Sequence, residues 1–475
     1  MVVLDGSSLT AGDIARIAGA GAEVSLTAEA RAAVARTNAQ SLAVTRPVYG
    51  RTTGVGGNRL IDLDDEGPDD FDPALALLRS HASSSGPLRS RERVRAMLVV
   101  RLNQLAAGGS GIDPVVLDGL LEMIHDDALP PVRELGSVGT GDLPALATTA
   151  LALIGEVPTS PPLTRVVPLG ISDALPLLSS NAATIADAAI ALARLQGLAR
   201  AALTIAAATF VGASGNGEAF SRAVEDVTPF DGAQSVCRVL RRLTAESPEA
   251  ARIQDPFALR ALPQVHGPLI DALSTLSDVV TRLANAPSEN PVYRPGFDVV
   301  HHGGFHVAYL AQALDAARLA LAEAAQLSLA RLSLLCAPDN TGLLPFLAGR
   351  PGASGVMVVE YVTAAALAEL RSSASPASLQ TVTLSNGVEE DASFASLAAR
   401  QALAAADSYR SVLAGELVAA VRCLRMKKLT PGPLLGLLSA CAGLGTSTAD
   451  RDLTSDLQLA EEVLEQATAR EGSFG

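Results

Sequence analysis

The sequence predicts an all-α protein built largely from long helices, and three observations lead to this prediction. Long stretches place Leu, Val and Ala at three- and four-residue spacing with charged side chains between them, as in residues 311–335 and 457–469. That spacing is typical of amphipathic helices. Strand-like alternation is short and scarce, at residues 2–4, 23–26 and 356–359. No period of about 20 to 50 residues repeats, so a solenoid is not expected.

The expected elements divide into two parts. Ser455 and Gln458 have the spacing of a capping box, which predicts that the last helix follows Ser455. Glycine and proline gather in stretches that we expect to be loops, and loops held by a rigid scaffold often carry functional groups. These stretches are residues 49–58, 83–87, 129–144, 285–304 and 343–355. We therefore expect a loop-rich N-terminal part, 1–190, and a long-helix bundle, 191–475.

Composition excludes several classes of function. The 475 residues include 36 basic and 50 acidic side chains, and the formal net charge is −14. Nucleic acids and anionic membranes select clustered positive charge, so neither is an expected partner. The longest uncharged stretch, residues 201–218, is interrupted by Thr, Ser and Gly, and no basic region precedes an apolar run at the start. Neither a transmembrane span nor a signal peptide is expected.

Cysteine and lysine usage narrows the chemistry further. The four cysteines lie far apart without a CxxC pair, which indicates neither a disulfide framework nor a zinc ribbon and fits a reducing cytoplasm. The only lysines are the adjacent Lys427 and Lys428. Such a pair is a poor candidate for a desolvated Schiff-base nucleophile, so pyridoxal phosphate chemistry is not expected.

Two glycine-rich loops are candidate functional segments. The first places Tyr49 and Arg51 among four glycines. A loop tyrosine can serve as a general base when positive charge or hydrogen bonds lower its pKa, and a tyrosine that packs on a turn is the alternative. The second loop, residues 135–144, resembles a phosphate cradle but lacks the Lys-Ser/Thr ending of a P-loop.

Two later segments add candidates. Arg260 is the natural bidentate partner of a substrate carboxylate, and a salt bridge between subunits is the alternative. His301, His302 and His306 lie close together in the sequence, but no carboxylate follows at ligand spacing. We therefore predict no metal site.

Taken in order, these segments resemble the aromatic amino acid ammonia-lyase and aminomutase family, which contains the histidine, phenylalanine and tyrosine lyases. The matching motifs are VVLDGSSLTAGDIARIA, YGRTTGVGG, SHASSSG, RLNQLAAGGSG, GSVGTGDLPALA, IQDPFALRALPQVHG, NAPSENP, GGFH and VEEDASF. The resemblance implies an ammonia-lyase-like helical bundle and a homotetramer whose active sites are shared between subunits. It also implies that Tyr49 comes from one chain on a mobile lid.

The resemblance raises a question about the prosthetic group. Family enzymes form 4-methylidene-imidazole-5-one (MIO) by cyclising an internal Ala-Ser-Gly or Thr-Ser-Gly between GSVG and DL. This chain has Gly139, Thr140 and Gly141 there, one residue short and without the serine. We therefore expect no cofactor and no MIO. The alternatives are that Thr140 dehydrates instead, or that a modified residue is hidden in the sequence.

The family's site residues carry over only in part. The chain has Phe257 for a family tyrosine, Gly304 for an asparagine and Ala392 for a histidine, and the asparagine of LALINGT falls at Ser179 or Asn181. His81 matches the substrate-selectivity position, although a core histidine is an equal alternative. The retained positions are Tyr49, His81, Gln254, Arg260, Asn290, Phe305 and Glu390.

Three functions are consistent with these residues. The first is a MIO-independent enzyme of specialised metabolism, in which Tyr49 and Glu390 perform acid-base chemistry on a small carboxylate-bearing substrate held by Arg260. Its reaction would be elimination or addition, isomerisation or cyclisation. The alternative is a conventional MIO-type ammonia-lyase or 2,3-aminomutase, and the second alternative is a non-catalytic binding homologue.

Overall fold

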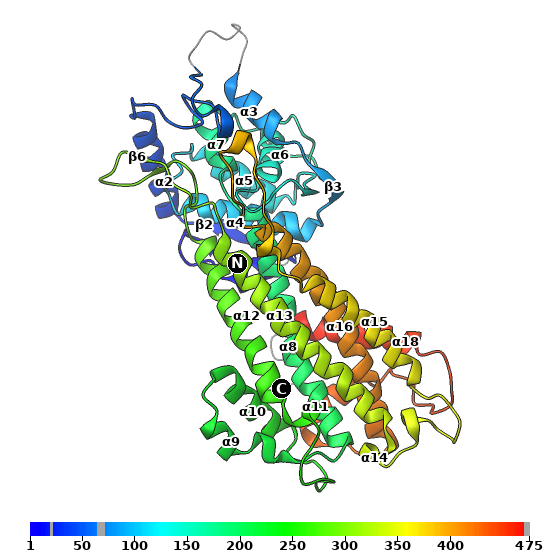
Figure 1. Ribbon diagram of the computed structural model, residues 1–475. Coiled ribbons are helices and arrows are strands. Elements are labelled where there is room, and N and C mark those ends of the chain that lie inside the picture. The colour runs from blue at the N-terminus through cyan, green and yellow to red at the C-terminus, as the bar shows by residue number, and fades with distance from the viewer. Residues whose placement is uncertain (20–21, 64–71, 470–475) are drawn as a thin grey trace. The chain divides into compact units, whose positions relative to one another are not determined.

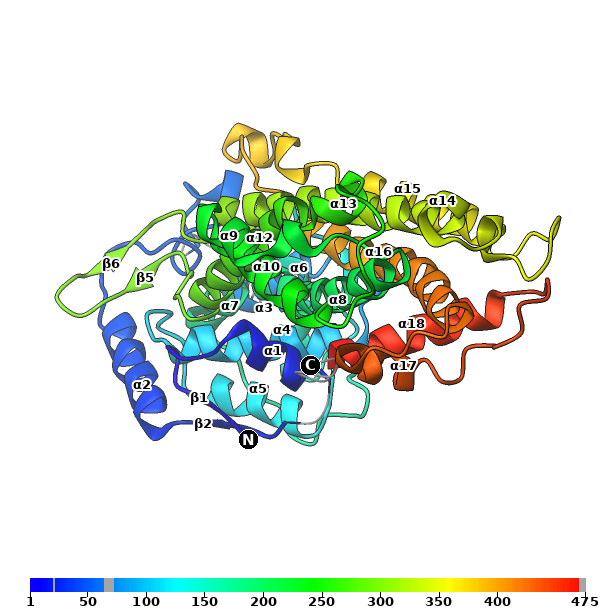
Figure 2. The ribbon, with the colours of Figure 1, turned by 90° about the horizontal axis from the view of Figure 1, so that it is seen from below.

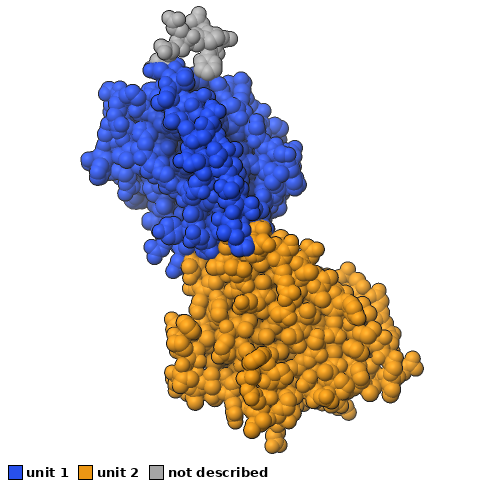
Figure 3. Space-filling model, viewed as in Figure 1, with its two compact units in different colours: residues 1–190, 277–314, 376–400 blue, residues 191–276, 315–375, 401–475 orange. Residues whose placement is uncertain are grey.

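Helices make up most of the regular structure in the computed structural model, which describes residues 1–19, 22–63 and 72–469 (Figure 1). The predicted all-α class is confirmed, and the strands form only three two-stranded pairs among the described residues. The chain forms two compact units, which Figure 3 colours separately. Unit 1 contains residues 1–190, 277–314 and 376–400, and unit 2 contains residues 191–276, 315–375 and 401–475.

Unit 1 contains short helices, short strands and connecting loops. Its helices are α1 (Ala11–Ala18), α2 (Ala28–Leu42), α3 (Pro73–His81), α4 (Arg91–Ala106), α5 (Val115–His125), α6 (Leu143–Leu153) and α7 (Ile171–Leu178). Its 3-10 turns are η1 (Gly56–Asn58), η4 (Ala377–Leu379) and η5 (Ser385–Gly387). Its strands are β1 (Val2–Leu4), β2 (Val24–Leu26), β3 (Ser85–Leu88), β4 (Arg133–Leu135), β5 (Val292–Tyr293) and β6 (Val299–Val300).

The strands pair locally and serve mainly to fix loops. β1 and β2 pair in parallel, with Val2 opposite Val24, and β2 lies against α5 (Figure 2). β3 pairs with β4 and β5 with β6 in antiparallel fashion. The β3–β4 pair ends directly before the glycine-rich loop that leads into α6, so it anchors the start of that loop.

Unit 2 is dominated by helices. Those that lie wholly within it are α9 (Arg222–Val227), α10 (Asp231–Leu243), α11 (Phe257–Arg260), α14 (Pro338–Thr341), α15 (Met357–Ser373), α17 (Leu435–Ala440) and α18 (Thr454–Ala469). Its 3-10 turns are η2 (Gly217–Phe220), η3 (Pro345–Leu347) and η6 (Gly432–Leu434). Four long helices contain residues of both units: α8 (Ala182–Gly212), α12 (Leu262–Ala284), α13 (Ala308–Cys336) and α16 (Ala395–Met426).

A buried ionic cluster links three of the long helices inside unit 2. Glu416 of α16 accepts from Arg331 Nε of α13 at 2.6 Å and from Thr209 Oγ1 of α8 at 2.8 Å. Both charged side chains are fully buried. A buried charge is tolerated only when it is paired and hydrogen-bonded, and these bonds meet that requirement.

Two local predictions were wrong. Residues 356–359 are not a strand, because α15 begins at Met357 and the helical spacing of apolar residues continues to its end at Ser373. Tertiary packing overrides the local β preference of Val there. The last helix begins at Thr454, whose amide donates to Asp452 Oδ1 at 2.8 Å. Ser455 is therefore already inside the helix and is not its cap.

Two segments are apolar and long enough, by length and composition alone, to cross a membrane. They are Ile171–Gly212 and Ala308–Cys336, with 94% and 50% of the tested window buried. Burial of this kind is also found in core helices of soluble proteins, so the observation is weak evidence for a membrane. The four cysteines are all buried and unpaired.

Candidate active site

A cavity of about 520 Å³ in unit 1 collects most of the residues that the sequence singled out. Residues from five separate stretches of the chain form its wall. They are Tyr49, Gly56, Arg59, Thr140, Gly141, Leu143, Leu175, Ser179, Asn290, Phe305, His306, Val388, Glu389, Glu390 and Asp391. The volume is in the range of small-molecule sites.

Tyr49 is held in place by its backbone and by its hydroxyl. Its amide donates to His301 Nε2 at 3.3 Å, and its phenol oxygen accepts from the Gly56 amide at 2.7 Å. Burial raises the pKa of the Tyr49 phenol, the Gly56 hydrogen bond lowers it, and the nearby Glu389 carboxylate raises it. The net shift is upward, so the phenol is protonated at neutral pH.

The loop around Tyr49 requires glycine at two points. Gly50 has φ +74°, and a Cβ there would lie 2.1 Å from Leu175 Cδ2. Gly56 has φ +56°, and a Cβ there would lie 2.5 Å from Ser385 Oγ. The Gly57 amide donates to the same Ser385 hydroxyl at 2.8 Å. Glycine therefore allows the Tyr49 loop to lie against its neighbours.

The loop Gly139–Thr140–Gly141 forms a second wall and is fixed at both ends. The Gly139 carbonyl accepts from Ser393 Oγ at 2.7 Å. The Gly141 amide donates to Asn181 Oδ1 at 3.1 Å. Gly139 and Gly141 are buried, whereas Thr140 is half-buried and lines the cavity.

Asp142 anchors this loop to α8. Its carboxylate accepts from the Thr184 amide at 2.7 Å and from Thr184 Oγ1 at 2.9 Å, and its own amide donates to the Ser180 carbonyl at 2.6 Å. Burial raises the pKa of Asp142, and Arg89 opposes that shift. The helix α6 begins directly after Asp142, so the loop is held between the start of α6 and the first turn of α8.

Ser179 and Asn181 both belong to the site, but they do different things. Ser179 caps α7 and its hydroxyl accepts from the Asn290 amide at 3.0 Å. Asn181 spans from the Gly141 amide to the Phe305 carbonyl, to which its Nδ2 donates. The two positions that the sequence left open are therefore both occupied by polar groups with separate partners.

A buried ion pair supports this wall. Arg101 on α4 pairs with Glu289 at 2.8 Å, and the two side chains are 0% and 1% exposed. Arg101 also donates to the carbonyls of Leu177 at 3.0 Å and of Pro176, at the end of α7. Asn290 follows Glu289 in the chain, so this pair fixes the segment on which Ser179 and Asn290 meet.

Acidic side chains form the remaining wall. Glu389, Glu390 and Asp391 follow one another along the cavity, and His306 Nε2 lies 3.2 Å from Asp391 Oδ2. Arg59 is the cation among the residues that line the cavity. The site therefore presents more negative than positive side chains to a ligand.

The three histidines do not converge. His301 accepts from the Tyr49 amide, the His302 ring contacts the Glu289 carbonyl at 2.6 Å, and His306 approaches Asp391. Within the described part of the chain, no three His, Cys, Asp or Glu side chains gather as metal ligands.

Four predicted substrate residues do not line this cavity, and one of them, Asn181, is buried behind the loop that does. His81 ends α3, where its Nδ1 contacts the Leu77 carbonyl at 2.9 Å. Gln254 and Arg260 belong to unit 2. With the Gln254 amide oxygen facing the guanidinium, it accepts from Arg260 at 2.7 and 3.0 Å. The Arg260 guanidinium also stacks on the exposed Phe257 ring at 4.4 Å.

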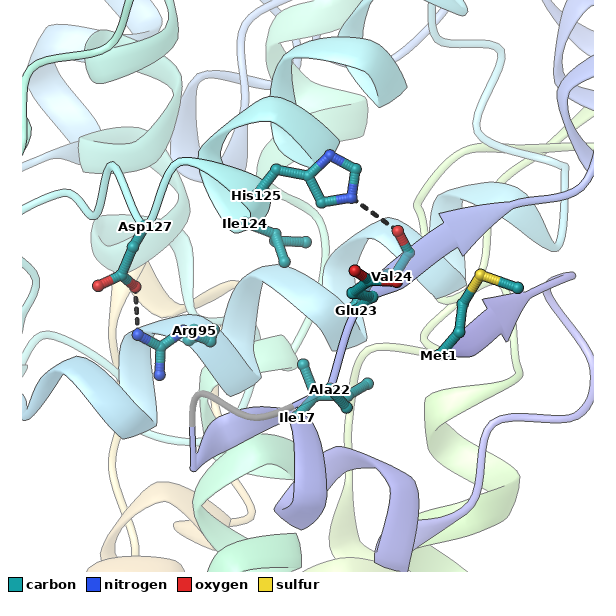
Figure 4. Close-up of a pocket in the computed structure, with 9 residues that line it drawn as sticks. All are labelled: Met1, Ile17, Ala22, Glu23, Val24, Arg95, Ile124, His125 and Asp127. Carbon is teal, nitrogen blue, oxygen red and sulfur yellow. Dashed lines mark hydrogen bonds and ion pairs between the residues drawn. The ribbon is translucent and has the colours of Figure 1, made fainter.

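A second cavity, of about 560 Å³, lies beside β2 and α5 (Figure 4). Three of its polar side chains, those of Arg95, His125 and Asp127, are already engaged with each other or with the backbone. Arg95 donates to Asp127 and to the Ala18 carbonyl, and the His125 Nε2 contacts the Val24 carbonyl at 2.7 Å. These groups are committed to the fold, so this cavity is the weaker candidate.

Comparison with known proteins identifies the family. The family model described as aromatic amino acid lyase matches residues 9–441. Histidine ammonia-lyase from Geobacillus thermodenitrificans is 33% identical over 502 residues, covering 100% of this chain and 99% of the relative. Histidine ammonia-lyase from Gloeobacter violaceus is 34% identical over 492 residues, covering 98% and 95%. The chain belongs to the aromatic amino acid lyase family and is a C–N lyase-type enzyme.

Solved structures agree. Histidine ammonia-lyase from Trypanosoma cruzi superposes with a TM-score of 0.88 at 26% identity, covering 98% of this chain and 93% of that one. Tyrosine aminomutase from Streptomyces globisporus gives 0.89 at 25% identity, covering 98% and 97%. Ergothionase from Treponema denticola gives 0.91 at 23% identity, covering 98% and 99%, which supports the fold alone.

These relatives correct one prediction. The expectation of no cofactor is wrong, because histidine ammonia-lyases use an MIO group formed from Ala-Ser-Gly. The prediction relied on a loop that is one residue short and lacks the serine. Thr140 nevertheless carries the kind of β-hydroxyl that dehydration requires. The relatives support the conventional ammonia-lyase or aminomutase alternative better than the MIO-independent one.

The residues around the loop fit a group formed from it. A hydroxyl donor faces the Gly139 carbonyl and an amide oxygen faces the Gly141 nitrogen, at the two positions that cyclisation joins. Gly139, Thr140 and Gly141 would form the group, with Ser393 and Asn181 holding it.

Several lining residues were not found from the sequence. Arg59, Glu389 and Asp391 were not singled out, although Glu389 and Asp391 flank the predicted Glu390 in the VEEDASF motif, and His306 was considered only as a metal ligand. Ser393 lies in the same motif. Its role becomes visible only when its bond to Gly139 brings together positions 254 residues apart.

Proposed function

We propose that this enzyme is an ammonia-lyase that eliminates ammonia from an amino acid, and that L-histidine is the first substrate to test. Full-length similarity to histidine ammonia-lyases carries the proposal. The cavity supports it, because Tyr49 and the Thr140 loop face the same space as an acidic wall.

The bound MIO-type group would supply an electrophile that turns the substrate amine into a better leaving group. Tyr49 supplies the base that removes a proton from the β-carbon, which lies next to the carbon that carries the departing nitrogen. The phenol is protonated at neutral pH, because burial and Glu389 raise its pKa. Turnover should therefore increase as pH rises toward the pKa of Tyr49.

The acidic wall suits the substrate's ammonium group. Glu390, with Glu389 and Asp391 beside it, places carboxylates along one side of the cavity. Opposite charges within a few ångströms attract. We assign Glu390 to holding the amine and to accepting or returning its proton.

The substrate carboxylate needs a cation, and we propose Arg260 of a second copy of the chain. Arg260 and Gln254 form one hydrogen-bonded unit on an exposed segment that also carries Ile253, which is 94% exposed, and Phe257. A planar guanidinium binds carboxylates in bidentate fashion. Asn290 and Phe305 would position the rest of the substrate from the cavity wall.

This arrangement requires an oligomer, and we propose a homotetramer in the cytoplasm. Val358, Tyr361 and Val362 on α15 are 60%, 70% and 43% exposed and share one helix face. An apolar face of this kind suits a second copy. Light scattering during size-exclusion chromatography should give four times the chain mass, and a monomer would contradict this proposal.

Activity on a small panel of amino acids tests the function. The purified enzyme is incubated with L-histidine, L-tyrosine or L-phenylalanine, and ammonia and the α,β-unsaturated acid are measured. Tyr49→Phe should lower turnover by about 100-fold or more. Tyr309→Phe removes the same hydroxyl from a tyrosine that is 81% exposed and does not line the cavity, and it serves as the matched control. Turnover retained in Tyr49→Phe would refute the role of the base.

The same assay separates the lyase from an aminomutase. An aminomutase would convert the α-amino acid into its β-isomer without net release of ammonia. The tyrosine aminomutase neighbour makes this the second candidate. A β-amino acid as the main product would replace the lyase proposal with that one.

A further inference from the structure

The loop Gly139–Thr140–Gly141 is held at the two atoms that an internal cyclisation joins. Ser393 Oγ donates to the Gly139 carbonyl oxygen at 2.7 Å, and the Gly141 nitrogen donates to Asn181 Oδ1 at 3.1 Å. Ser393, Asn181, Gly139 and Gly141 are all buried. Water therefore does not compete for these hydrogen bonds.

We propose that this tripeptide cyclises with Thr140 in place of serine, and that Ser393 is the positioning residue that activates the Gly139 carbonyl. The inference rests on the proposed function for its purpose, but the covalent change is measured independently of turnover. The product would be an ethylidene analogue of MIO, because threonine carries one more methyl group than serine.

The reaction balances without an oxidant or a reductant. The Gly141 nitrogen attacks the Gly139 carbonyl carbon and forms the ring bond. The carbonyl oxygen then leaves as water, with the hydrogens of the Gly141 and Thr140 nitrogens. Thr140 loses its Cα hydrogen and its β-hydroxyl as a second water, which leaves a carbon–carbon double bond. The chain becomes lighter by two waters.

Ser393 is placed to lower the barrier of the first step. Negative charge develops on the Gly139 oxygen as the nitrogen attacks, and a preorganised hydroxyl donor stabilises it. The Ser393 hydroxyl is itself oriented, because its oxygen accepts from the Ala395 amide at 3.3 Å. This bond leaves the hydroxyl proton for the Gly139 carbonyl.

Asn181 is oriented for the complementary task. Its Nδ2 donates to the Phe305 carbonyl, which turns Oδ1 toward the Gly141 amide. An acceptor on that N–H increases electron density on the nitrogen and directs it. Ser137 Oγ donates to the Gly141 carbonyl at 3.1 Å, so the tripeptide has little freedom to open.

The space around Gly139 is fitted to a glycine. Its φ is +89°, and a Cβ would lie 2.2 Å from Ser393 Oγ and 2.8 Å from the Ala395 nitrogen. An alanine at position 139 would force the two segments apart. Glycine therefore allows the Ser393 hydroxyl to reach the Gly139 carbonyl.

Intact mass of the denatured full-length protein tests the inference. We expect the wild type to be lighter by two waters, and digestion should place the loss in the peptide that contains Thr140. Thr140→Ser should lose two waters, whereas Thr140→Ala should lose at most one. An unmodified wild-type mass would overturn the proposal.

Ser393→Ala tests the positioning role. Newly synthesised protein should lose its waters about 100-fold more slowly than the wild type. Ser396→Ala is the matched control, because Ser396 donates to the Ser137 carbonyl at 2.8 Å from the same segment without touching Gly139. Maturation of Ser393→Ala at the wild-type rate would overturn the role of Ser393.

Two further results keep the tests separate. If Ser393→Ala does not fold, Ser393→Thr retains the hydroxyl and should mature, and failure to mature in a folded Ser393→Thr would count against the proposal. A two-water loss without amino acid turnover would refute the proposed function and leave this inference standing. Turnover with an unmodified mass would refute this inference and leave the proposed function standing.

Discussion

The ion pair between Arg101 and Glu289 gives the most quantitative prediction about the site's scaffold. Glu289→Leu should lower the free energy of unfolding by about 3–5 kcal/mol, because it leaves the buried guanidinium without its partner. The lower end is expected, since Arg101 keeps the carbonyls of Leu177 and Pro176 as acceptors. Burial shifts both members toward their neutral forms, lowering the pKa of Arg101 and raising that of Glu289.

Arg101→Met should behave differently. Glu289 Oε2 has no hydrogen-bond partner, so the stranded carboxylate has little else to stabilise it and should take up a proton. The loss should also be about 3–5 kcal/mol near neutral pH. It should become smaller as pH falls, because protonation removes the buried charge.

The double variant Arg101→Met with Glu289→Leu removes both charges and should cost less than the two single changes together. The coupling should be about 3 kcal/mol, as expected for a directly paired couple. Urea denaturation followed by circular dichroism measures the three free energies, with unchanged m-values as the control. The reasoning would be refuted if the double variant lost as much free energy of unfolding as the two single variants together, or if each single variant lost less than about 1 kcal/mol.

Three other outcomes follow from the site and the core. Glu389→Gln should lower the pKa of Tyr49 and move the rising limb of the kcat/KM profile to lower pH by about one unit or less; an unchanged or alkaline limb would argue against Tyr49 as the base. Burial and Arg331 lower the pKa of His266 to about 3. The unfolded chain protonates this histidine below about pH 6.5, whereas the folded protein keeps it neutral down to about pH 3, so the free energy of unfolding should fall by about 1.4 kcal/mol per pH unit across that range. His266→Gln should flatten the pH dependence of the urea midpoint, and an unaltered slope would count against this. Gly139→Ala should cost about 2 kcal/mol or more, from its positive φ and its clash with the Ala395 amide, and wild-type stability in urea would contradict the fit of that loop.

The helical architecture could be predicted because its signal is periodic and local. Residues 311–335 follow the 3.6-residue period closely, and α13 runs from Ala308 to Cys336. The strand predicted at residues 356–359 was wrong because a short run rich in valine has a local preference for a strand, whereas here it enters the first turn of α15. What decides between them is packing against other parts of the chain.

Residues of the candidate site could be predicted only where the sequence around them forms a recognisable motif. Tyr49 stands out among its glycines, and Glu390 stands in a matched motif. The separate roles of Ser179 and Asn181 differ by a two-residue shift that no spacing rule resolves. Ser393 lies in a matched motif, but its role has no local signal, since its partner Gly139 is brought to it by the fold.

The cofactor prediction gave a local departure too much weight. It rested on a loop that is one residue short and lacks the motif's serine at Gly139–Thr140–Gly141. Similarity to histidine ammonia-lyases over the whole chain carries more weight than that local departure.

The stoichiometry of products from L-histidine tests the central claim most directly. The purified enzyme should release one ammonia for each imidazolyl-acrylate that forms, with absorbance and an ammonia assay rising together. Folded enzyme that releases neither product from L-histidine or from the aromatic amino acids would contradict the proposed elimination of ammonia.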